Sequence, residues 1–201
     1  MIDDIKKKAL NEDVPIIKDG GLEFILNMIK ERNIKNILEL GTAVGYSSIN
    51  MALLDKNIHI DTIEKNEDMY KQAVVNIKNE GLDNQISVYF VPIEEFKSNK
   101  KYDLIFVDAA KAQYGKYTEQ FLDNLEDGGV FVYDNMIFHG MVYDIENIKN
   151  RNTRSLVRKI ASFLELMRND QRFDIMFYED VGDGLLVASR RQKWKKKTWP
   201  F

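Results

Sequence analysis

Asn36-Ile-Leu-Glu-Leu-Gly-Thr-Ala-Val-Gly-Tyr-Ser-Ser48 is the stretch that decides the fold. Its apolar run stops at Gly41 and a helical pattern begins after Gly45, so the sequence predicts a buried strand, a tight turn and a helix. Both glycines let the backbone approach a ligand closely, and the start of the helix offers unpaired N–H groups. Ser47 and Ser48 are candidate N-caps of this helix.

The spacing of the two glycines, Gly-x-x-x-Gly, differs from the Gly-x-Gly-x-x-Gly spacing of dinucleotide-binding proteins. Glu39 lies at the end of the predicted strand and would place a carboxylate beside the turn. That charge suits a cationic amino-acid group better than a pyrophosphate. Taken alone, the stretch fits a plain strand-to-helix connection as well as it fits a ligand site.

The composition restricts the class of protein. A chain of 201 residues fits one domain with a full core, and the expectation is a single domain over 1–201. No apolar run approaches the ~20 residues of a membrane span, and there is no apolar signal region near the N-terminus, so a cytoplasmic protein is expected. The absence of cysteine excludes disulfides and thiolate metal sites. With a net charge of −3, any contact with nucleic acid must come from a local basic patch.

Strand and helix patterns alternate along most of the chain, which predicts an α/β fold with a doubly wound, mostly parallel sheet. A terminal hairpin fits an antiparallel edge strand. N-terminal helices are expected within 1–35, and a basic tail covers 190–201. The predicted strands are 37–40, 59–64, 86–91, 102–108, 130–134, 173–178 and 185–189, and the predicted helices are 2–10, 21–32, 67–80, 114–125 and 153–168.

Acidic residues stand at the predicted strand ends, which converge on one edge of a parallel sheet. Glu64 lies about 20 residues after the glycine turn, where α/β nucleotide-binding proteins place an acid on a ribose diol, although a helix-capping or surface glutamate is the alternative. Asp108, Asp134 and Asn135 offer hard oxygen ligands that suit Mg²⁺ or another divalent ion. Each acid alone could simply cap a turn, but the set favours a metal. Lys111 would return to the same face and could accept a proton, or it could be a solvated lysine.

Five motifs follow one another along about residues 12–190: Glu39-Leu-Gly-Thr-Ala-Val-Gly-Tyr-Ser47, Ile63-Glu64, Val107-Asp-Ala-Ala-Lys-Ala-Gln-Tyr114, Asp134-Asn135 and Gly182-Asp-Gly-Leu185. In this order they resemble the metal-dependent S-adenosylmethionine O-methyltransferases of the catechol and caffeoyl-CoA type. Three further stretches resemble the short bacterial branch that methylates 5-hydroxyuridine at wobble position 34 of tRNA, giving 5-methoxyuridine. They are Val14-Pro-Ile-Ile17, Asp134-Asn-Met-Ile-Phe-His-Gly-Met-Val142 and Arg154-Ser-Leu-Val-Arg-Lys-Ile-Ala-Ser-Phe163.

The resemblance implies a class I methyltransferase fold, which is Rossmann-like with seven strands, and it suggests a homodimer. It implies that a divalent cation is held by Asp108, Asp134 and Asn135, and that Lys111 is catalytic together with Asp108. It also implies a set of residues that contact S-adenosylmethionine: Ile17, Glu39, Gly41, Gly45, Ser47, Glu64, Pro92, Ile93 and Asp108.

The substrate stays open, because a catechol and a 5-hydroxyuracil both present two neighbouring oxygens to a cation. A tRNA substrate predicts a basic rim, for which the candidates are Lys116, Arg151, Arg154, Arg158, Lys159 and the tail at 190–197. A small catechol-type substrate predicts a closed apolar pocket under the 136–145 loop, lined by Met136, Phe138, Met141 and Tyr143. A binding module without chemistry is the third possibility, and the intact acidic and lysine set argues against it.

Overall fold

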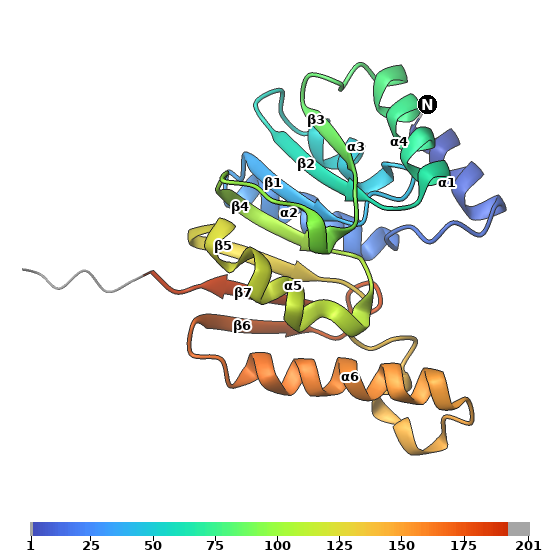
Figure 1. The fold of residues 1–201 in the computed structure, drawn as a ribbon, viewed down its shortest axis with the longest axis vertical. Coiled ribbons are helices and arrows are strands. Elements are labelled where there is room, and N and C mark those ends of the chain that lie inside the picture. The colour runs from blue at the N-terminus through green and yellow to red at the C-terminus, as the bar shows by residue number, and fades with distance from the viewer. Residues whose placement is uncertain (1, 193–201) are drawn as a thin grey trace, which may run out of the picture.

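A seven-stranded sheet with the order β3-β2-β1-β4-β5-β7-β6 runs through the centre of the protein (Figure 1). The computed structural model describes residues 2–192. The first five strands pair in parallel. The strands are β1 (Asn36–Leu40), β2 (His59–Glu64), β3 (Ile86–Phe90), β4 (Tyr102–Val107), β5 (Leu125–Tyr133), β6 (Phe173–Tyr178) and β7 (Leu185–Arg190).

The strand order reverses between β1 and β4, because the chain adds β2 and β3 on one side of β1 and β4 and β5 on the other. This arrangement confirms the predicted doubly wound, mostly parallel sheet. At such a reversal point the connections leave in opposite directions, so a crevice opens beyond the carboxyl ends of the strands. The glycine turn after β1 lies at this point.

Helices cover both faces of the sheet and make a three-layered molecule (Figure 1). One apolar core lies between the sheet and α1 to α4, and a second lies between the sheet and α5 and α6. The α-helices are α1 (Ile2–Asn11), α2 (Asp19–Glu31), α3 (Tyr46–Ala52), α4 (Glu67–Asn79), α5 (Tyr114–Phe121) and α6 (Arg151–Arg168). The short 3₁₀ turns are η1 (Ile93–Glu95), η2 (Lys111–Gln113), η3 (Leu122–Asn124), η4 (Met141–Tyr143) and η5 (Ile145–Asn147).

The central strands are buried on both faces, which explains their near-continuous apolar sequence. In β1, Ile37 packs in the core under α1 to α4, whereas Leu38 packs in the core under α5 and α6. In β4, Phe106 and Val107 divide between the two cores in the same way. Within the described part of the chain, no helix is both long and apolar enough to cross a bilayer.

The antiparallel strand β7 lies one place in from the sheet edge, and β6 occupies the edge itself. The predicted antiparallel strand is therefore present, but it is not the edge strand. The reason is the path of the chain through α6. After this helix the chain enters β6, which is placed one strand position away from β5, and β7 then turns back and pairs with both β5 and β6. The predicted basic tail begins at Arg190, the last residue of β7, and its residues 193–201 lie outside the described residues.

Candidate active site

The turn after β1 needs glycine at its first position. Gly41 has a φ of +106°, and a Cβ atom built there would lie 2.2 Å from the carbonyl oxygen of Asp108. The N–H groups of Gly41 and Thr42 both donate to the Ile63 carbonyl oxygen at 3.1 Å. These contacts draw the ends of β1, β2 and β4 together, so the turn can lie directly beside whatever binds beyond them.

Glu39 is fully buried and holds the turn from behind. Ser47 Oγ and Thr62 Oγ1 each donate to its carboxylate at 2.5 Å, and Ser48 Oγ donates as well. Burial raises the pKa of Glu39 to about 7, and the three hydroxyl donors oppose the increase. The prediction that Ser47 or Ser48 caps α3 is wrong, because Gly45 is the N-cap residue and the helix starts at Tyr46. Both serines therefore lie in the first turn of α3, where their hydroxyls reach Glu39.

A cavity of about 690 Å³ lies beyond the carboxyl ends of the parallel strands, which is an ordinary size for a small-molecule site. Here we call it the strand-end cavity. Most of the residues predicted to contact the cofactor line it: Ile17, Gly41, Ser47, Glu64, Ile93 and Asp108. Three of the predicted cofactor residues do not line it: Glu39, Gly45 and Pro92.

Glu64, at the end of β2, has features of both alternatives from the sequence, an acid that binds a ribose diol and a glutamate that supports the start of a helix. Its Oε2 accepts a hydrogen bond from the Ala43 N–H at 2.9 Å, and its Oε1 accepts one from the Asn66 N–H at 2.7 Å. The carboxylate thus supports the glycine turn and the start of α4. It also lines the strand-end cavity, where its remaining lone pairs can accept hydrogen bonds from a diol.

Asp108 and Asp134 come from the ends of neighbouring strands β4 and β5 and meet at the wall of the strand-end cavity. Burial raises the pKa of Asp108 above its ordinary value, and the charge of Lys111 opposes this increase. Burial, followed by repulsion from Asp108, raises the pKa of Asp134 to about 7. Two acids that repel each other in a low-dielectric site are stabilised by a shared cation or proton. Lys111 lines the same cavity and is attracted to both.

The residues predicted to hold a metal therefore lie together. Asn135 follows Asp134 and also lines the cavity, so the donor set is two carboxylates and an amide. These hard oxygen ligands fit Mg²⁺ or a similar ion. Within residues 2–192 no group of three His, Cys, Asp or Glu side chains is arranged to hold a metal, so the predicted site depends on the Asn135 amide as its third side-chain ligand.

Comparison with known proteins decides the family. A statistical model of a family described as O-methyltransferase matches residues 4–191. The chain belongs to this O-methyltransferase family. Caffeoyl-CoA O-methyltransferase from Medicago sativa is 32% identical over 181 residues, which cover 84% of this chain and 72% of that one. The relative from Populus kitakamiensis that carries the same name is 30% identical over 178 residues, or 83% and 74% of the two chains.

Solved structures of bacterial proteins match the fold of this O-methyltransferase closely. A Staphylococcus aureus protein described as a candidate caffeoyl-CoA O-methyltransferase superposes with a TM-score of 0.90 at 35% identity, over 94% of this chain and 91% of that one. The O-methyltransferase from Bacillus cereus, solved in complex with SAH, gives 0.80 at 25% identity over 94% and 90%. The O-methyltransferase described here thus has the fold of enzymes that bind S-adenosylmethionine.

Sequence reasoning missed the role of Asp183 in this O-methyltransferase. Asp183 is 2% exposed and lines the strand-end cavity. Asp183 accepts a hydrogen bond from the His139 backbone N–H at 2.9 Å, and it forms an ion pair with Lys18 Nζ at 3.4 Å. It therefore ties the loop after β5 to the segment before α2. The Gly182-Asp-Gly-Leu185 motif was a partial signal, because an antiparallel strand begins at the edge where the parallel strands end, but the motif alone does not place that strand beside β5.

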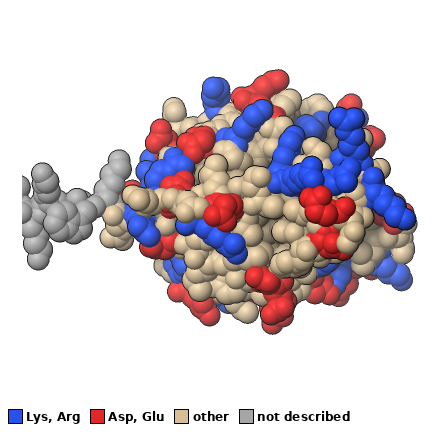
Figure 2. Space-filling model, turned by 90° about the horizontal axis from the view of Figure 1, so that it is seen from below, with Lys and Arg blue, Asp and Glu red and all other residues tan. Residues whose placement is uncertain are grey.

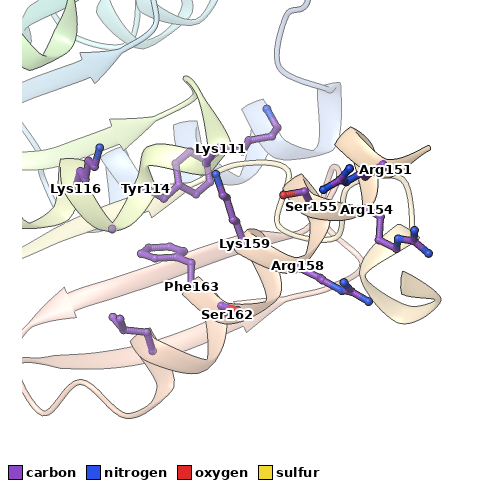
Figure 3. A pocket seen from close by; sticks show the side chains of 13 residues that line it. Lys111, Tyr114, Lys116, Arg151, Arg154, Ser155, Arg158, Lys159, Ser162 and Phe163 are labelled. Atoms are coloured by element: carbon purple, nitrogen blue, oxygen red, sulfur yellow. The ribbon is translucent and has the colours of Figure 1, made fainter. Parts of the chain in front are cut away.

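A second cavity of about 730 Å³, here called the basic cavity, adjoins the first, since Lys111 lines both. Its cations come from the segment η2–α5 and from α6 (Figure 3), and Figure 2 shows Lys and Arg gathered toward the end of the molecule opposite the grey atoms. The cationic lining consists of Lys111, Lys116, Arg151, Arg154, Arg158 and Lys159, which includes all the predicted substrate candidates outside the tail. Among the described residues, only one of these six cations, Arg158, has an ion-pair partner, which is Glu146 at 3.0 Å.

The described start of the tail, residues 190–192, lies at the opposite end of the sheet, because β7 is antiparallel, and Arg190 there donates to the Leu122 carbonyl oxygen at 2.9 Å. Residues 193–197 lie outside the described residues, so the predicted part of the tail in a basic rim stays a prediction.

The closed apolar pocket under the 136–145 loop is not formed by the predicted residues. Only Phe138 of that set lines the strand-end cavity. Met136 is buried in the core ahead of the two short 3₁₀ turns of this loop, whereas Tyr143, in the first of these turns, is 60% exposed.

Proposed function

We propose that this O-methyltransferase moves the methyl group of S-adenosylmethionine to one of two neighbouring oxygens on a small, catechol-like acceptor, assisted by a divalent cation. The observation that carries the proposal is the meeting of Asp108, Asp134 and Lys111 on one cavity wall beside the glycine turn. The cavity thus combines a place for a methyl donor, a set of hard oxygen ligands and a base.

Each group has a defined task in the reaction. Asp108, Asp134 and Asn135 would hold the cation, which when bound lowers the pKa of a hydroxyl group and aligns the two acceptor oxygens. Lys111 would take the proton from the hydroxyl, a step that requires its amine to be uncharged at that moment. The oxygen then forms a bond to the methyl carbon while the carbon–sulfur bond breaks and SAH leaves. This displacement requires an in-line arrangement, which the rigid turn at Gly41 and the Glu64 carboxylate support by orienting the donor.

The named relatives support a small phenolic acceptor better than a tRNA. A caffeoyl group contains a catechol ring, which matches a cation held by hard oxygen ligands. Coenzyme A carries phosphate groups, which match a basic cavity. Because Lys111 lines both cavities, one extended acceptor could place its ring in the strand-end cavity and its phosphates against α6.

A tRNA that carries 5-hydroxyuridine is the second candidate, and the basic cavity is the observation that favours it. Arg151 and Arg154 lie in the first turns of α6, which has no acidic residue in its first turn. Positive side chains at a helix N-terminus add to the helix dipole and are unfavourable unless an anion is nearby. The basic cavity therefore offers cations that suit the phosphate groups of an anticodon loop.

The test is transfer of radiolabel from S-adenosylmethionine in the presence of Mg²⁺ to free catechol, caffeoyl-CoA and tRNA bearing 5-hydroxyuridine. We expect a phenolic acceptor to be labelled and a chelator to abolish labelling. Labelling of tRNA alone would reject the first candidate in favour of the second. Labelling of none of the three would reject both.

The cation is tested separately. Asp134→Ala should abolish transfer while the Kd for S-adenosylmethionine stays within about threefold, since a ligand to the cation acts mainly on the acceptor. Asp144→Ala, on the loop beside the site, is the matched control and should retain activity. Full activity of Asp134→Ala in the presence of a chelator would exclude the proposed cation.

A further inference from the structure

Tyr114 has a contact that the reaction outlined above does not use. It is the first residue of α5 and is fully buried, and its phenol Oη donates a hydrogen bond to the carbonyl oxygen of Asp134 at 2.9 Å. Its position lies three residues after Lys111 in the same segment (Figure 3). One short stretch of chain thus supplies both the proposed base and a contact to the backbone of the proposed cation ligands.

The bonded carbonyl belongs to the peptide group between Asp134 and Asn135. Because this peptide group joins the two residues, a rotation of its plane would displace both side chains. The turn formed by Asp134 and Asn135, here called the corner, is also conformationally demanding, since Asn135 has a φ of +56° in the left-handed region. β5 ends at Tyr133, so the Asp134 carbonyl lies beyond the pairing with β7, and the phenol is the partner that it has instead.

The remaining bonds at this corner fix other atoms. The Asp134 N–H donates to the Val107 carbonyl at 3.2 Å, and the Asn135 N–H donates to Asp134 Oδ1 at 2.7 Å. The Met136 N–H donates to the Gly184 carbonyl at 2.9 Å. Without the phenol, the buried carbonyl would be left without its bond, and the peptide plane would be held only by the bond from the Asn135 N–H to Asp134 Oδ1, which lies within the same two residues.

Tyr133 provides an internal comparison, because it is a buried tyrosine whose hydroxyl has a different partner. Its ring lies 5.5 Å from the Tyr114 ring and is equally buried. Its hydroxyl is hydrogen-bonded to Thr118 Oγ1 at 2.7 Å, and Thr118 Oγ1 donates in turn to the Tyr114 carbonyl oxygen at 2.8 Å. Removal of either hydroxyl deletes one buried hydrogen bond and leaves the ring in place, but only the Tyr114 hydroxyl bonds to the Asp134 carbonyl.

We infer that Tyr114 is a positioning residue that orients the Asp134–Asn135 peptide group, and through it both ligands, for the divalent cation. The inference rests on the proposed function, because it presupposes that Asp134 and Asn135 bind a cation. A hydrogen bond that orients a metal ligand typically contributes about 10–100-fold to affinity for the metal. The contribution of Tyr114 should therefore appear in metal affinity, and affinity for the methyl donor should not change.

The test compares Tyr114→Phe with Tyr133→Phe by titration with Mn²⁺, observed by electron paramagnetic resonance in the absence of substrates. We expect Tyr114→Phe to weaken Mn²⁺ binding by about 10–100-fold and Tyr133→Phe to change it by less than about threefold. The Kd for S-adenosylmethionine should stay within about threefold in both. In activity assays, saturating metal should restore much of the kcat of Tyr114→Phe, which a general loss of structure would not allow.

Hydrogen exchange of the metal-free variants provides the second measurement and applies even if one variant is less stable. Amides at 134–138 should exchange faster in Tyr114→Phe than in Tyr133→Phe when each is compared at equal global stability. Equal exchange in the two variants, or equal Mn²⁺ affinity, would overturn the inference while leaving the proposed function intact. Failure of the unmodified protein to bind Mn²⁺ would overturn the proposed cation and this inference together.

Discussion

Glu39→Gln isolates the energetic consequence of burying an acid behind the glycine turn. Burial raises the pKa of Glu39 to about 7, from an ordinary value of 4.5. A folded-state pKa above the unfolded one means that the folded protein holds the proton more tightly. The stabilising contribution of the protonated form is therefore complete below pH 4.5 and is lost as the pH rises through about 7. Glutamine cannot ionise, so the variant should not show this loss.

The size of the effect follows from the same two values. The difference between 4.5 and about 7 corresponds to about 3 kcal/mol of unfolding free energy once Glu39 is ionised. Glutamine also places an amide NH₂ near the hydroxyls of Ser47, Ser48 and Thr62, which adds a cost that does not depend on pH. The informative quantity is therefore how the difference between the variant and the unmodified protein changes with pH. We expect it to shift by about 2–3 kcal/mol in favour of the variant between pH 5 and pH 8.

The assay is urea unfolding of the metal-free protein at pH 5, 6, 7 and 8. The control is Glu95→Gln, an exposed glutamate of η1 that should show no comparable change. Because Glu39 does not line the strand-end cavity, the Kd for S-adenosylmethionine should change by no more than about threefold. A stability difference that stays flat between pH 5 and pH 8, or falls, would refute the assignment of a raised pKa. A loss of donor binding beyond tenfold would mean that Glu39 contacts the cofactor after all.

Three further predictions concern the turn, the cation and the basic cavity. Gly41→Ala should destabilise the protein by about 2–4 kcal/mol and abolish donor binding, since its Cβ would meet the Asp108 carbonyl, whereas Gly140→Ala, with open space around it, should cost only about 1 kcal/mol in thermal unfolding. The rise in Tm caused by Mg²⁺ should grow from pH 5 to pH 8 and vanish in Asp134→Asn, because the ion must displace a proton from a carboxyl whose pKa is about 7; a Tm shift independent of pH would contradict this. Arg154→Glu should reduce labelling of caffeoyl-CoA or tRNA by about tenfold and that of free catechol by less than threefold, and equal losses would argue against an anion site in the basic cavity.

Several site residues could be predicted because their positions follow from topology. The carboxyl ends of neighbouring parallel strands must meet, so Asp108 and Asp134 had to lie close together once β4 and β5 were recognised. Lys111 follows from the short 3₁₀ turn that returns the chain to the same edge. Asp183 did not follow, because its place depends on β7 pairing between β5 and β6, and local pattern does not fix the order of strands in a hairpin at a sheet edge.

The direction of Glu39 could not be obtained from local sequence either. Whether an acid at a strand end faces a ligand or the underlying helix depends on where that helix begins. α3 begins at Tyr46, directly after Gly45, so Ser47 and Ser48 become donors to Glu39 and not caps. A shift of one turn in the helix start would have reversed these roles, and boundaries of this kind are decided by packing against the sheet.

The sequence by itself determined the strand-and-helix alternation, the glycine turn and the acids at the strand ends, because hydrophobic periodicity and glycine conformation are local properties of the chain. Only the tertiary structure decided that Asp183 joins these acids in one cavity, that Glu39 is buried behind the turn, and that the cations of α6 adjoin Lys111. Those relations depend on contacts between segments far apart in the chain, such as the Tyr114 phenol and the Asp134 carbonyl, and burial in such contacts sets their chemistry.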